Sequence, residues 1–179
     1  MSSAESLSKG LVQVFTGQGR GKTSAAIGTV VRALGNGLRV FIVAFMKAGR
    51  PSGEWVTLSR LDNVQVVRFG SPHFVDPARV TPEDREQAVQ ALKAAREAML
   101  SGDYDLVVLD EVNVAVEWKL VSVEEILRLI EDRPANVELI LTGRGADKEI
   151  IRAADLVTEM LNIKHPYEDG TAARRGIEY

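Results

Sequence analysis

The chain has 179 residues, of which 45% are hydrophobic and 26% charged, as in an ordinary single globular domain. Its formal net charge of -3 gives no overall attraction to nucleic acid or to an anionic membrane, so we expect neither as a partner. The absence of cysteine excludes disulfides, thiolate metal sites and cysteine nucleophiles, and it favours a cytoplasmic location. No stretch reaches the roughly 18 apolar residues of a membrane span. Residues 1–10 are polar and predict a flexible N-terminal arm, which precedes one domain over residues 11–179.

Apolar runs and glycine-rich turns alternate in the first part of the chain. Residues 11–16 (LVQVFT) form a short β-branched and aromatic run that predicts a buried strand. A helix is expected from Lys22 to Leu34, and the glycines within residues 35–37 end it. The nearly continuous apolar run at 39–46 is typical of a strand covered on both faces in a parallel sheet.

The same alternation continues toward the C-terminus. A short helix and a strand at 64–69 lead into the long loop 70–84, and Thr81 is the expected N-cap of a helix over 81–100. The remaining elements expected from periodicity are strands at 104–111 and 137–145 and helices at 122–132 and 147–155. The sequence therefore predicts an α/β fold with a single, mostly parallel sheet flanked by helices.

The turn between the first strand and the first helix has the composition of a phosphate-binding P-loop. Residues 15–28 read FTGQGRGKTSAAIG, with Gly21-Lys22-Thr23 at the start of the helix. Glycines let successive N–H groups converge on phosphate oxygens, and the helix adds its positive N-terminal end. Lys22 supplies a mobile cation for the outer phosphates, and the Thr23 hydroxyl can bind Mg²⁺.

One position departs from the usual P-loop pattern. The glycine expected six residues before the lysine is replaced by Thr16, and Gly17 and Gly19 instead make a denser loop. A glycine-rich turn that binds nothing is the alternative interpretation. The combination of strand, turn, Lys-Thr pair and helix favours phosphate binding.

Two acids end the buried strand at 104–111. Asp110 and Glu111 occupy the place at which P-loop proteins hold Mg²⁺ with a carboxylate, although an ordinary solvated acidic pair is the alternative. The two motifs together predict a site for a nucleoside triphosphate with Mg²⁺ or Mn²⁺. They leave the reaction open. A P-loop ATPase would use Glu111 as a base, and a kinase would need a basic lid, for which loop 70–84 offers only Arg79.

The last third of the chain, together with the P-loop, resembles a known family. Residues 141–179 (LTGRGADKEI through RRGIEY), the P-loop region 16–37, FMKAG at 45–49 and VVLDEVNVAV at 107–116 are similar to the ATP:corrinoid adenosyltransferases of cobalamin synthesis. The similarity covers most of the chain from residue 11 onward. It implies a P-loop NTPase fold with a recombinase-like architecture.

The resemblance implies a reaction different from ATP hydrolysis. In this family a corrinoid reduced to Co(I) attacks the 5′ carbon of the ATP ribose, cobalt receives the 5′-deoxyadenosyl group, and triphosphate leaves intact. Because Co(I) is itself a strong nucleophile, no serine, cysteine or histidine nucleophile is needed, and the sequence offers no convincing triad. The protein has to neutralise the departing triphosphate and place the 5′ carbon in line. Family members hold ATP reversed in the P-loop relative to most P-loop enzymes.

The family's ATP-binding and metal-binding residues can be matched to this sequence. The implied ATP loop comprises Gly17, Gln18, Gly19, Arg20, Gly21, Lys22, Thr23 and Ser24. Thr23 and Glu111 match the metal and nucleotide contacts, and Asp110 is expected to support them. Lys22 and Glu111 are implied to be catalytic, together with Arg144 of the TGRG turn.

Three implied contacts have open alternatives. Arg144 is expected to contact the triphosphate or the second substrate, although a surface ion pair would also explain it. Asn113 could bond ribose or corrinoid, or could cap a helix. Relatives use an aromatic-bearing loop to expel the lower axial ligand of cobalt, and Phe74 is our candidate for that wedge, with a loop-anchoring role as the alternative. The neighbouring His73 is better explained as a solvated histidine than as a cobalt ligand.

The resemblance also implies partners. The corrinoid has to be reduced before transfer, so an electron-donating flavoprotein or reduced flavin is expected. A homodimer is expected as well. Both expectations come from the family and not from composition or spacing.

Overall fold

The computed structural model of the protein describes residues 7–48, 52–71 and 75–178. It contains one six-stranded sheet with the order β3-β2-β4-β5-β1-β6, and all five strand pairs are parallel. The strands are β1 (Val12–Thr16), β2 (Val40–Ala44), β3 (Val64–Arg68), β4 (Leu106–Asp110), β5 (Glu138–Thr142) and β6 (Leu156–Glu159). The helices are α1 (Lys22–Gly35), α2 (Gly53–Leu58), α3 (Pro82–Leu100), α4 (Val112–Glu117), α5 (Val123–Glu131) and α6 (Lys148–Ala153).

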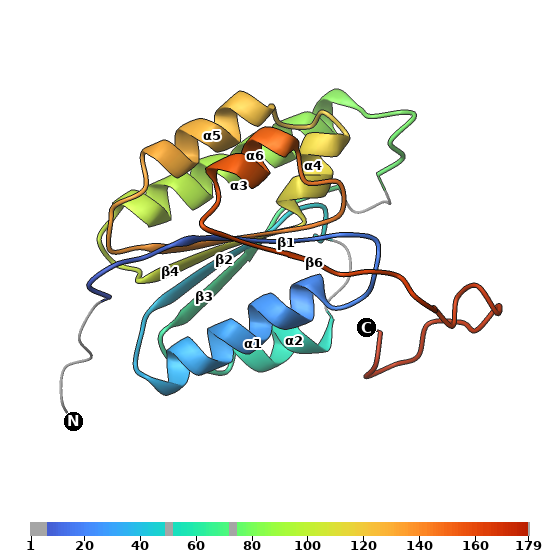
Figure 1. Ribbon diagram of the computed structural model, residues 1–179, viewed down its shortest axis with the longest axis horizontal. Coiled ribbons are helices and arrows are strands. Elements are labelled where there is room, and N and C mark those ends of the chain that lie inside the picture. Colours follow the sequence, from blue (N-terminus) through green and yellow to red (C-terminus); the bar gives the residue numbers. More distant parts are fainter. Residues whose placement is uncertain (1–6, 49–51, 72–74, 179) are drawn as a thin grey trace.

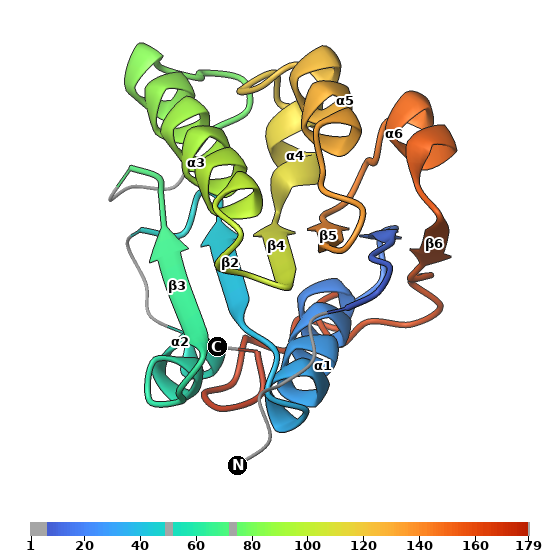
Figure 2. The same ribbon diagram turned by 90° about the vertical axis from the view of Figure 1, so that its left-hand side faces the viewer.

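Helices cover both faces of the sheet. α1 and α2 lie on one face, and α3, α4, α5 and α6 lie on the other (Figures 1 and 2). The central strands β2 and β4 are buried along their whole length, which explains why they appear in the sequence as continuous apolar runs. Each face has its own apolar cluster, with Ile42 and Val108 on the α1 side and Val43 and Leu109 on the α3 side.

The register of the strands brings four carboxyl ends to one edge of the sheet. Ala44 of β2 is opposite Asp110 of β4, and Phe15 of β1 is opposite Thr142 of β5. The turns that follow these strands therefore meet at the same edge. This is where ligands bind in open parallel sheets.

The expected α/β fold with a helix-flanked parallel sheet is confirmed. Thr81 caps α3 as expected, in a reciprocal arrangement in which its hydroxyl accepts from the Asp84 N–H and the Asp84 carboxylate accepts from the Thr81 N–H. Helix α4 was not predicted, because its sequence VNVAVE is dominated by β-branched valine. The division at residue 10 stays a prediction: residues 1–6 lie outside the described part, and the Gly10 N–H donates to the Ala135 carbonyl.

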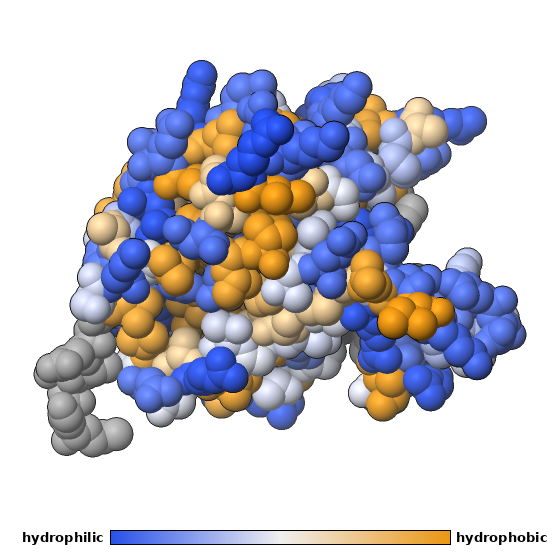
Figure 3. All heavy atoms as spheres, viewed as in Figure 1, coloured by the Kyte–Doolittle hydropathy of each residue, from blue (hydrophilic) through white to orange (hydrophobic). Residues whose placement is uncertain are grey.

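The C-terminal segment, residues 160–178, leaves the edge strand β6 and contains no helix or strand. It stands out from the body of the molecule in the space-filling view (Figure 3). Residues 176–178 return to the end of the sheet near α1 and α2 (Figures 1 and 2). Across residues 7–48, 52–71 and 75–178, no helix has the length and apolar character needed to cross a bilayer.

Candidate active site

The P-loop joins β1 to α1 and is closed by its own lysine. Gly17 (φ 97°) and Gly21 (φ 121°) have the left-handed backbone that favours glycine. Lys22 begins α1, and its Nζ donates to the carbonyls of Gly17 at 2.8 Å and Gly19 at 2.7 Å. The ammonium group therefore lies over the loop, at the N-terminal end of the helix where an anion is favoured.

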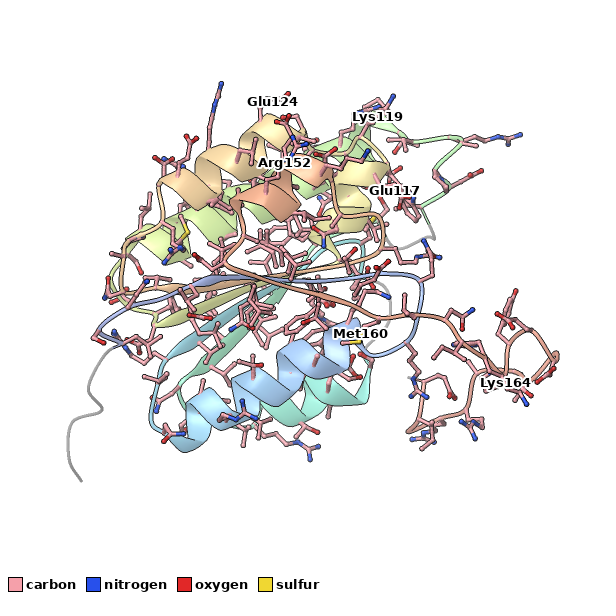
Figure 4. The ribbon with its side chains drawn as sticks, viewed as in Figure 1. Glu117, Lys119, Glu124, Arg152, Met160 and Lys164 are labelled. Atoms are coloured by element: carbon pink, nitrogen blue, oxygen red, sulfur yellow. The ribbon has the colours of Figure 1, made fainter. Side chains whose placement is uncertain are left out.

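The closely spaced glycines of the loop are explained by the residues that follow β6. The Gly19 N–H donates to the Met160 carbonyl at 2.6 Å, and Met160 lies close to the start of α1 (Figure 4). A Cβ on Gly19 would lie 2.4 Å from the Leu161 carbonyl oxygen, and one on Gly17 would lie 2.5 Å from that of Met160. These two glycines are thus required by the close approach of the neighbouring strand, and the Gly19 N–H is already bonded to protein.

Thr16, which replaces the usual first glycine, also has a structural role. Its side chain is buried, and its Oγ1 accepts a hydrogen bond from the Ala146 N–H at 3.2 Å. The bond ties the end of β1 to the turn that follows β5. The departure from the usual P-loop pattern is therefore a local adaptation to the turn that carries Arg144.

Asp110 is the centre of a buried polar network at the sheet edge. It is 1% exposed, and its Oδ1 accepts from the hydroxyls of Thr23 at 2.8 Å and Thr142 at 2.7 Å. Its Oδ2 accepts from Lys47 Nζ at 2.5 Å. One carboxylate thus connects the start of α1 with the ends of β2, β4 and β5. The acid expected to support the site is its most connected member.

Glu111 follows Asp110 with a left-handed backbone, and its side chain is half-buried. Its φ is 65°, and its N–H donates to Thr142 Oγ1 at 3.0 Å, so the chain leaves β4 and enters α4 within one residue. Its carboxylate lies 3.8 Å from Lys47 Nζ and has no hydrogen-bond partner in the described part of the chain. Burial and the nearby Asp110 raise the pKa of Glu111, although Lys47, Lys22 and Arg144 oppose the shift.

Two cavities meet at this edge of the sheet. The first, of about 790 Å³, is lined by the P-loop residues 20–24, by one side of α1, by the start of α2 and by residues 176–178. The second, of about 350 Å³, has an apolar wall that includes Phe45, Val114 and Trp118, and Arg144 lies at it as well. Three side chains line both cavities, namely those of Lys22, Lys47 and Glu111.

Cations dominate the wall that the two cavities share. Burial lowers the pKa of Lys22, and Arg144 adds to this effect against the opposing attraction of Glu111. Burial also acts to lower the pKa of Lys47, but the carboxylates of Asp110 and Glu111 outweigh it, so that the pKa of Lys47 is raised. With Arg144 beside the two lysines, the wall is suited to a polyanion.

The structure brings together most of the residues expected from the sequence. Arg20, Gly21, Lys22, Thr23, Ser24 and Glu111 line the first cavity, and Arg144 joins Lys22 and Glu111 at the second. Arg144 is exposed, and no ion pair joins it to another described residue, so its alternative role in a surface ion pair also stays a prediction. Its ligand contact stays a prediction.

Other expected residues are placed differently. The carbonyls of Gly17 and Gly19 hold Lys22, whereas Gln18 is exposed and lines neither cavity. Asn113 is fully buried inside α4, where its Nδ2 donates to the Gly143 carbonyl at 3.4 Å. The N-cap of α4 is Glu111, so the alternative role of Asn113 as a helix cap is wrong. Phe74 and His73 lie outside the described residues.

Arg20 is held by the far end of the chain. Its guanidinium donates to the Ile177 carbonyl and to Glu178 Oε1, the latter at 3.2 Å. Glu178 is bound in turn by Arg174, whose hydrogen bonds lower the pKa of Glu178 to about 2. The nucleotide loop and the C-terminus thus form one side of the first cavity together.

The oxygen ligands present at the site fit Mg²⁺. Because the Thr23 hydroxyl donates its proton to Asp110, the lone pairs of Thr23 Oγ1 are available to a metal. The Glu111 carboxylate is a second hard oxygen ligand on the same cavity. The described chain contains no group of three or more His, Cys, Asp or Glu that could hold a metal unaided. Such a partial set suits an ion whose remaining ligands are phosphate and water oxygens.

Several residues of the site were missed by sequence reasoning. Lys47 and Thr142 fell within quoted motifs, but neither was given a role. A lysine just after a buried strand was the available signal for Lys47, since strand ends form the site in parallel sheets. Met160 and Glu178 gave no signal, because their contacts with the P-loop span more than 140 residues of sequence.

The fold and the site define a P-loop nucleotide-binding protein. The structure is similar to the crystal structure of the RadB recombinase, with a TM-score of 0.53 over 86% of this chain and 75% of that one, at 16% identity. At this identity the likeness shows the fold alone, and it confirms the expected recombinase-like architecture.

Sequence comparison identifies the family. Residues 8–179 match the family described as ATP:corrinoid adenosyltransferase BtuR/CobO/CobP. Corrinoid adenosyltransferases of Pseudomonas aeruginosa and Escherichia coli K12 are 36% and 34% identical to the chain. Each alignment covers 96% of this chain, with 84% and 86% of the respective relative. The chain therefore belongs to the ATP:corrinoid adenosyltransferase family, as its motifs suggested.

Proposed function

We propose that the first cavity holds the triphosphate of ATP and the second receives the reacting face of the corrinoid, with the ribose at their shared wall. The chain is an enzyme of its family, which transfers the 5′-deoxyadenosyl group of ATP to the Co(I) of a reduced corrinoid and releases triphosphate. The observation that carries this arrangement is that Lys22, Lys47 and Glu111 line both cavities. ATP in the first cavity and a corrinoid in the second would therefore be neighbours.

In this proposal the chain's own groups make triphosphate a good leaving group. Lys22 and the amides at the start of α1 bind the negative charge that develops on the departing oxygens, and residues 20–24 hold the chain of phosphates. Arg144 adds a further cation at the side of the second cavity. The apolar wall formed by Phe45, Val114 and Trp118 excludes water from the approach to the 5′ carbon.

Thr23 and Glu111 would hold Mg²⁺, or Mn²⁺, against the phosphates. The ion supplies charge neutralisation of the triphosphate when it is bound. Asp110 fixes the Thr23 hydroxyl with its oxygen lone pairs free. The Glu111 carboxylate lies 3.8 Å from Lys47 Nζ and accepts no hydrogen bond among the described residues, so its oxygens are available to the ion.

The decisive experiment separates adenosyl transfer from phosphate hydrolysis. The protein is incubated anaerobically with Mg-ATP and a chemically reduced corrinoid, and the absorbance change of adenosyl–cobalt formation is followed together with the phosphate products. We expect one triphosphate for each adenosylcorrinoid. ADP without a cobalt–carbon bond would support the alternative P-loop ATPase or kinase, which the family membership does not favour.

We further propose the partners that the family resemblance implies. These are a reduced flavin or flavoprotein as electron donor, a second copy of the chain in a homodimer, and a cytoplasmic location. Each remains a prediction. Size-exclusion chromatography with light scattering tests the homodimer, and reduction of the corrinoid by a flavin-dependent donor in the presence of the protein tests the reductant.

A further inference from the structure

The backbone after β2 is constrained so that Lys47 points back over the sheet. The Phe45 N–H donates to the Asp110 carbonyl at 3.0 Å, and the Lys47 N–H donates to the Phe69 carbonyl at 2.9 Å. Between them, Met46 has a φ of 56°, a left-handed conformation that is unfavourable for a non-glycine residue. Gly70 packs so closely that a Cβ there would lie 2.8 Å from Met46 Cα. Unfavourable backbone geometry that is held from both neighbouring strands points to a functional role for the residue that it places.

The Lys47 side chain is held by two acids and an aromatic ring. Its Nζ lies 2.5 Å from Asp110 Oδ2 and 3.8 Å from Glu111 Oε1. It also lies 5.7 Å from the ring centroid of Trp55, which is 4% exposed. These contacts come from β4 and from α2, so the ammonium group is fixed on several sides.

We propose that Lys47 is a positioning residue for adenosyl transfer, which holds the Asp110 carboxylate in the orientation that fixes the Thr23 hydroxyl beside the first cavity. A carboxylate that is 1% exposed needs a partner of opposite charge, because removing one member of a buried pair leaves an uncompensated charge. The same carboxylate accepts from the hydroxyls of Thr23 and Thr142, so a change in its orientation would disturb both hydrogen bonds.

The side chains of this network lie at the cavities, so their exact positions affect the reaction as well as folding. Thr23 is the first residue after the P-loop lysine, and Lys22 and Lys47 both line the nucleotide cavity and the second cavity. Displacing a bound reactant by about 1 Å can lower a rate about 100-fold even when binding persists. The role therefore predicts a loss in kcat that exceeds the loss in ATP affinity.

The test uses four variants and one control in the full-length protein. Lys47→Met removes the charge at similar length, Lys47→Arg keeps it, Asp110→Asn removes the buried partner charge, and Lys47→Met/Asp110→Asn makes the pair neutral. The control is Lys93→Met on α3, whose exposed ammonium lies 3.9 Å from Glu97. Titration calorimetry with Mg-ATP gives the affinity and the fraction of protein competent to bind. The kcat at saturating ATP and reduced corrinoid is divided by that fraction, so that unfolded protein does not enter the comparison.

We expect Lys47→Met to lower kcat by about 100-fold and ATP affinity by less than about 10-fold, while the control leaves both unchanged. Lys47→Arg should stay within about 10-fold of the wild type. The neutral pair should recover about 10-fold of the kcat lost in Lys47→Met, since the side-chain amide introduced by Asp110→Asn still offers an oxygen to both threonines. A double variant no faster than Lys47→Met, or a Lys47→Met with the wild-type kcat, overturns the proposal.

This inference rests on the proposed function, and the same assays keep the two apart. A wild-type protein that forms no adenosyl–cobalt bond would contradict the proposed function itself. An active wild type combined with no recovery in the double variant would contradict the role of Lys47 alone.

Discussion

Replacing Gly19 by alanine tests the contact between the P-loop and the C-terminal end of β6. Gly19 does not have the left-handed φ of Gly17 and Gly21, so alanine can adopt its backbone conformation without strain. Its methyl carbon, however, would lie 2.4 Å from the Leu161 carbonyl oxygen and 2.8 Å from that of Met160. These are backbone atoms that cannot rotate away, and the loop or the strand end has to move.

The loss in the free energy of unfolding follows from the interactions that this movement disturbs. The hydrogen bond of 2.6 Å from the Gly19 N–H to the Met160 carbonyl contributes about 0.5–1.5 kcal/mol. Forcing an extra carbon into a packed contact costs about 1–3 kcal/mol. Together we expect a decrease of about 2–4 kcal/mol in the free energy of unfolding. For a domain of this size this corresponds to a Tm lower by about 5–15 °C.

Thermal and urea unfolding measure the stability change, and Mg-ATP affinity is measured on the same samples. The matched control is Gly35→Ala, at the end of α1, where a Cβ would have no atom within 4 Å. The control should be unchanged or more stable by up to about 1 kcal/mol. If Gly19→Ala were as stable as the wild type and bound ATP equally well, the strand end would not be the reason for the dense glycine loop.

Three further predictions concern the charged groups of the first cavity. Lys22→Ala should lower turnover on the order of 100–1,000-fold, because it removes charge stabilisation that grows as triphosphate departs; the initial rate of cobalt–carbon bond formation measures it. Glu178→Gln should tighten ATP binding up to about 5-fold by calorimetry, because it removes the carboxylate that pairs with Arg20 and a negative charge from the cavity. Glu168→Gln in the same segment should leave ATP binding unchanged. The acid limit of turnover should lie at a higher pH than the ordinary pKa of glutamate, because the pKa of Glu111 is raised. The alkaline limit should lie at a lower pH than the ordinary pKa of lysine, because burial lowers the pKa of Lys22. A pH profile limited at unperturbed values would contradict these assignments.

The layers of the fold and the P-loop could be predicted from the sequence because both are local. Central strands such as β2 and β4 are apolar throughout, since helices cover both of their faces. The glycine turn between β1 and α1 needs only its own residues to be recognised. Helix α4 escaped prediction because tertiary burial, and not its valine-rich sequence, stabilises it; five of its six residues are buried.

The contacts that organise the site could not be predicted, because they join segments that are distant in sequence. Asp110 receives hydrogen bonds from Thr23, 87 residues away, from Lys47, 63 residues away, and from Thr142, 32 residues away. Strand order decides which of these ends become neighbours, and periodicity does not encode strand order. The acidic pair was recognised, but only the structure shows that Asp110 is buried in the network and that Glu111 lines both cavities.

The C-terminal part of the described chain supports the nucleotide loop from several sides, and this links the stability of the fold to its function. β1 lies between β5 and β6, so the P-loop that follows it is held from one side by the turn after β5, through Thr16 and Ala146. From the other side it is held by Met160 after β6. Residues 177–178 then bind Arg20 from a third direction. Because these supports of the loop all come from the C-terminal part of the chain, changes in that region should alter ATP binding before they alter the core. The family motifs at the end of the chain are therefore explained by their contacts with a loop near its beginning.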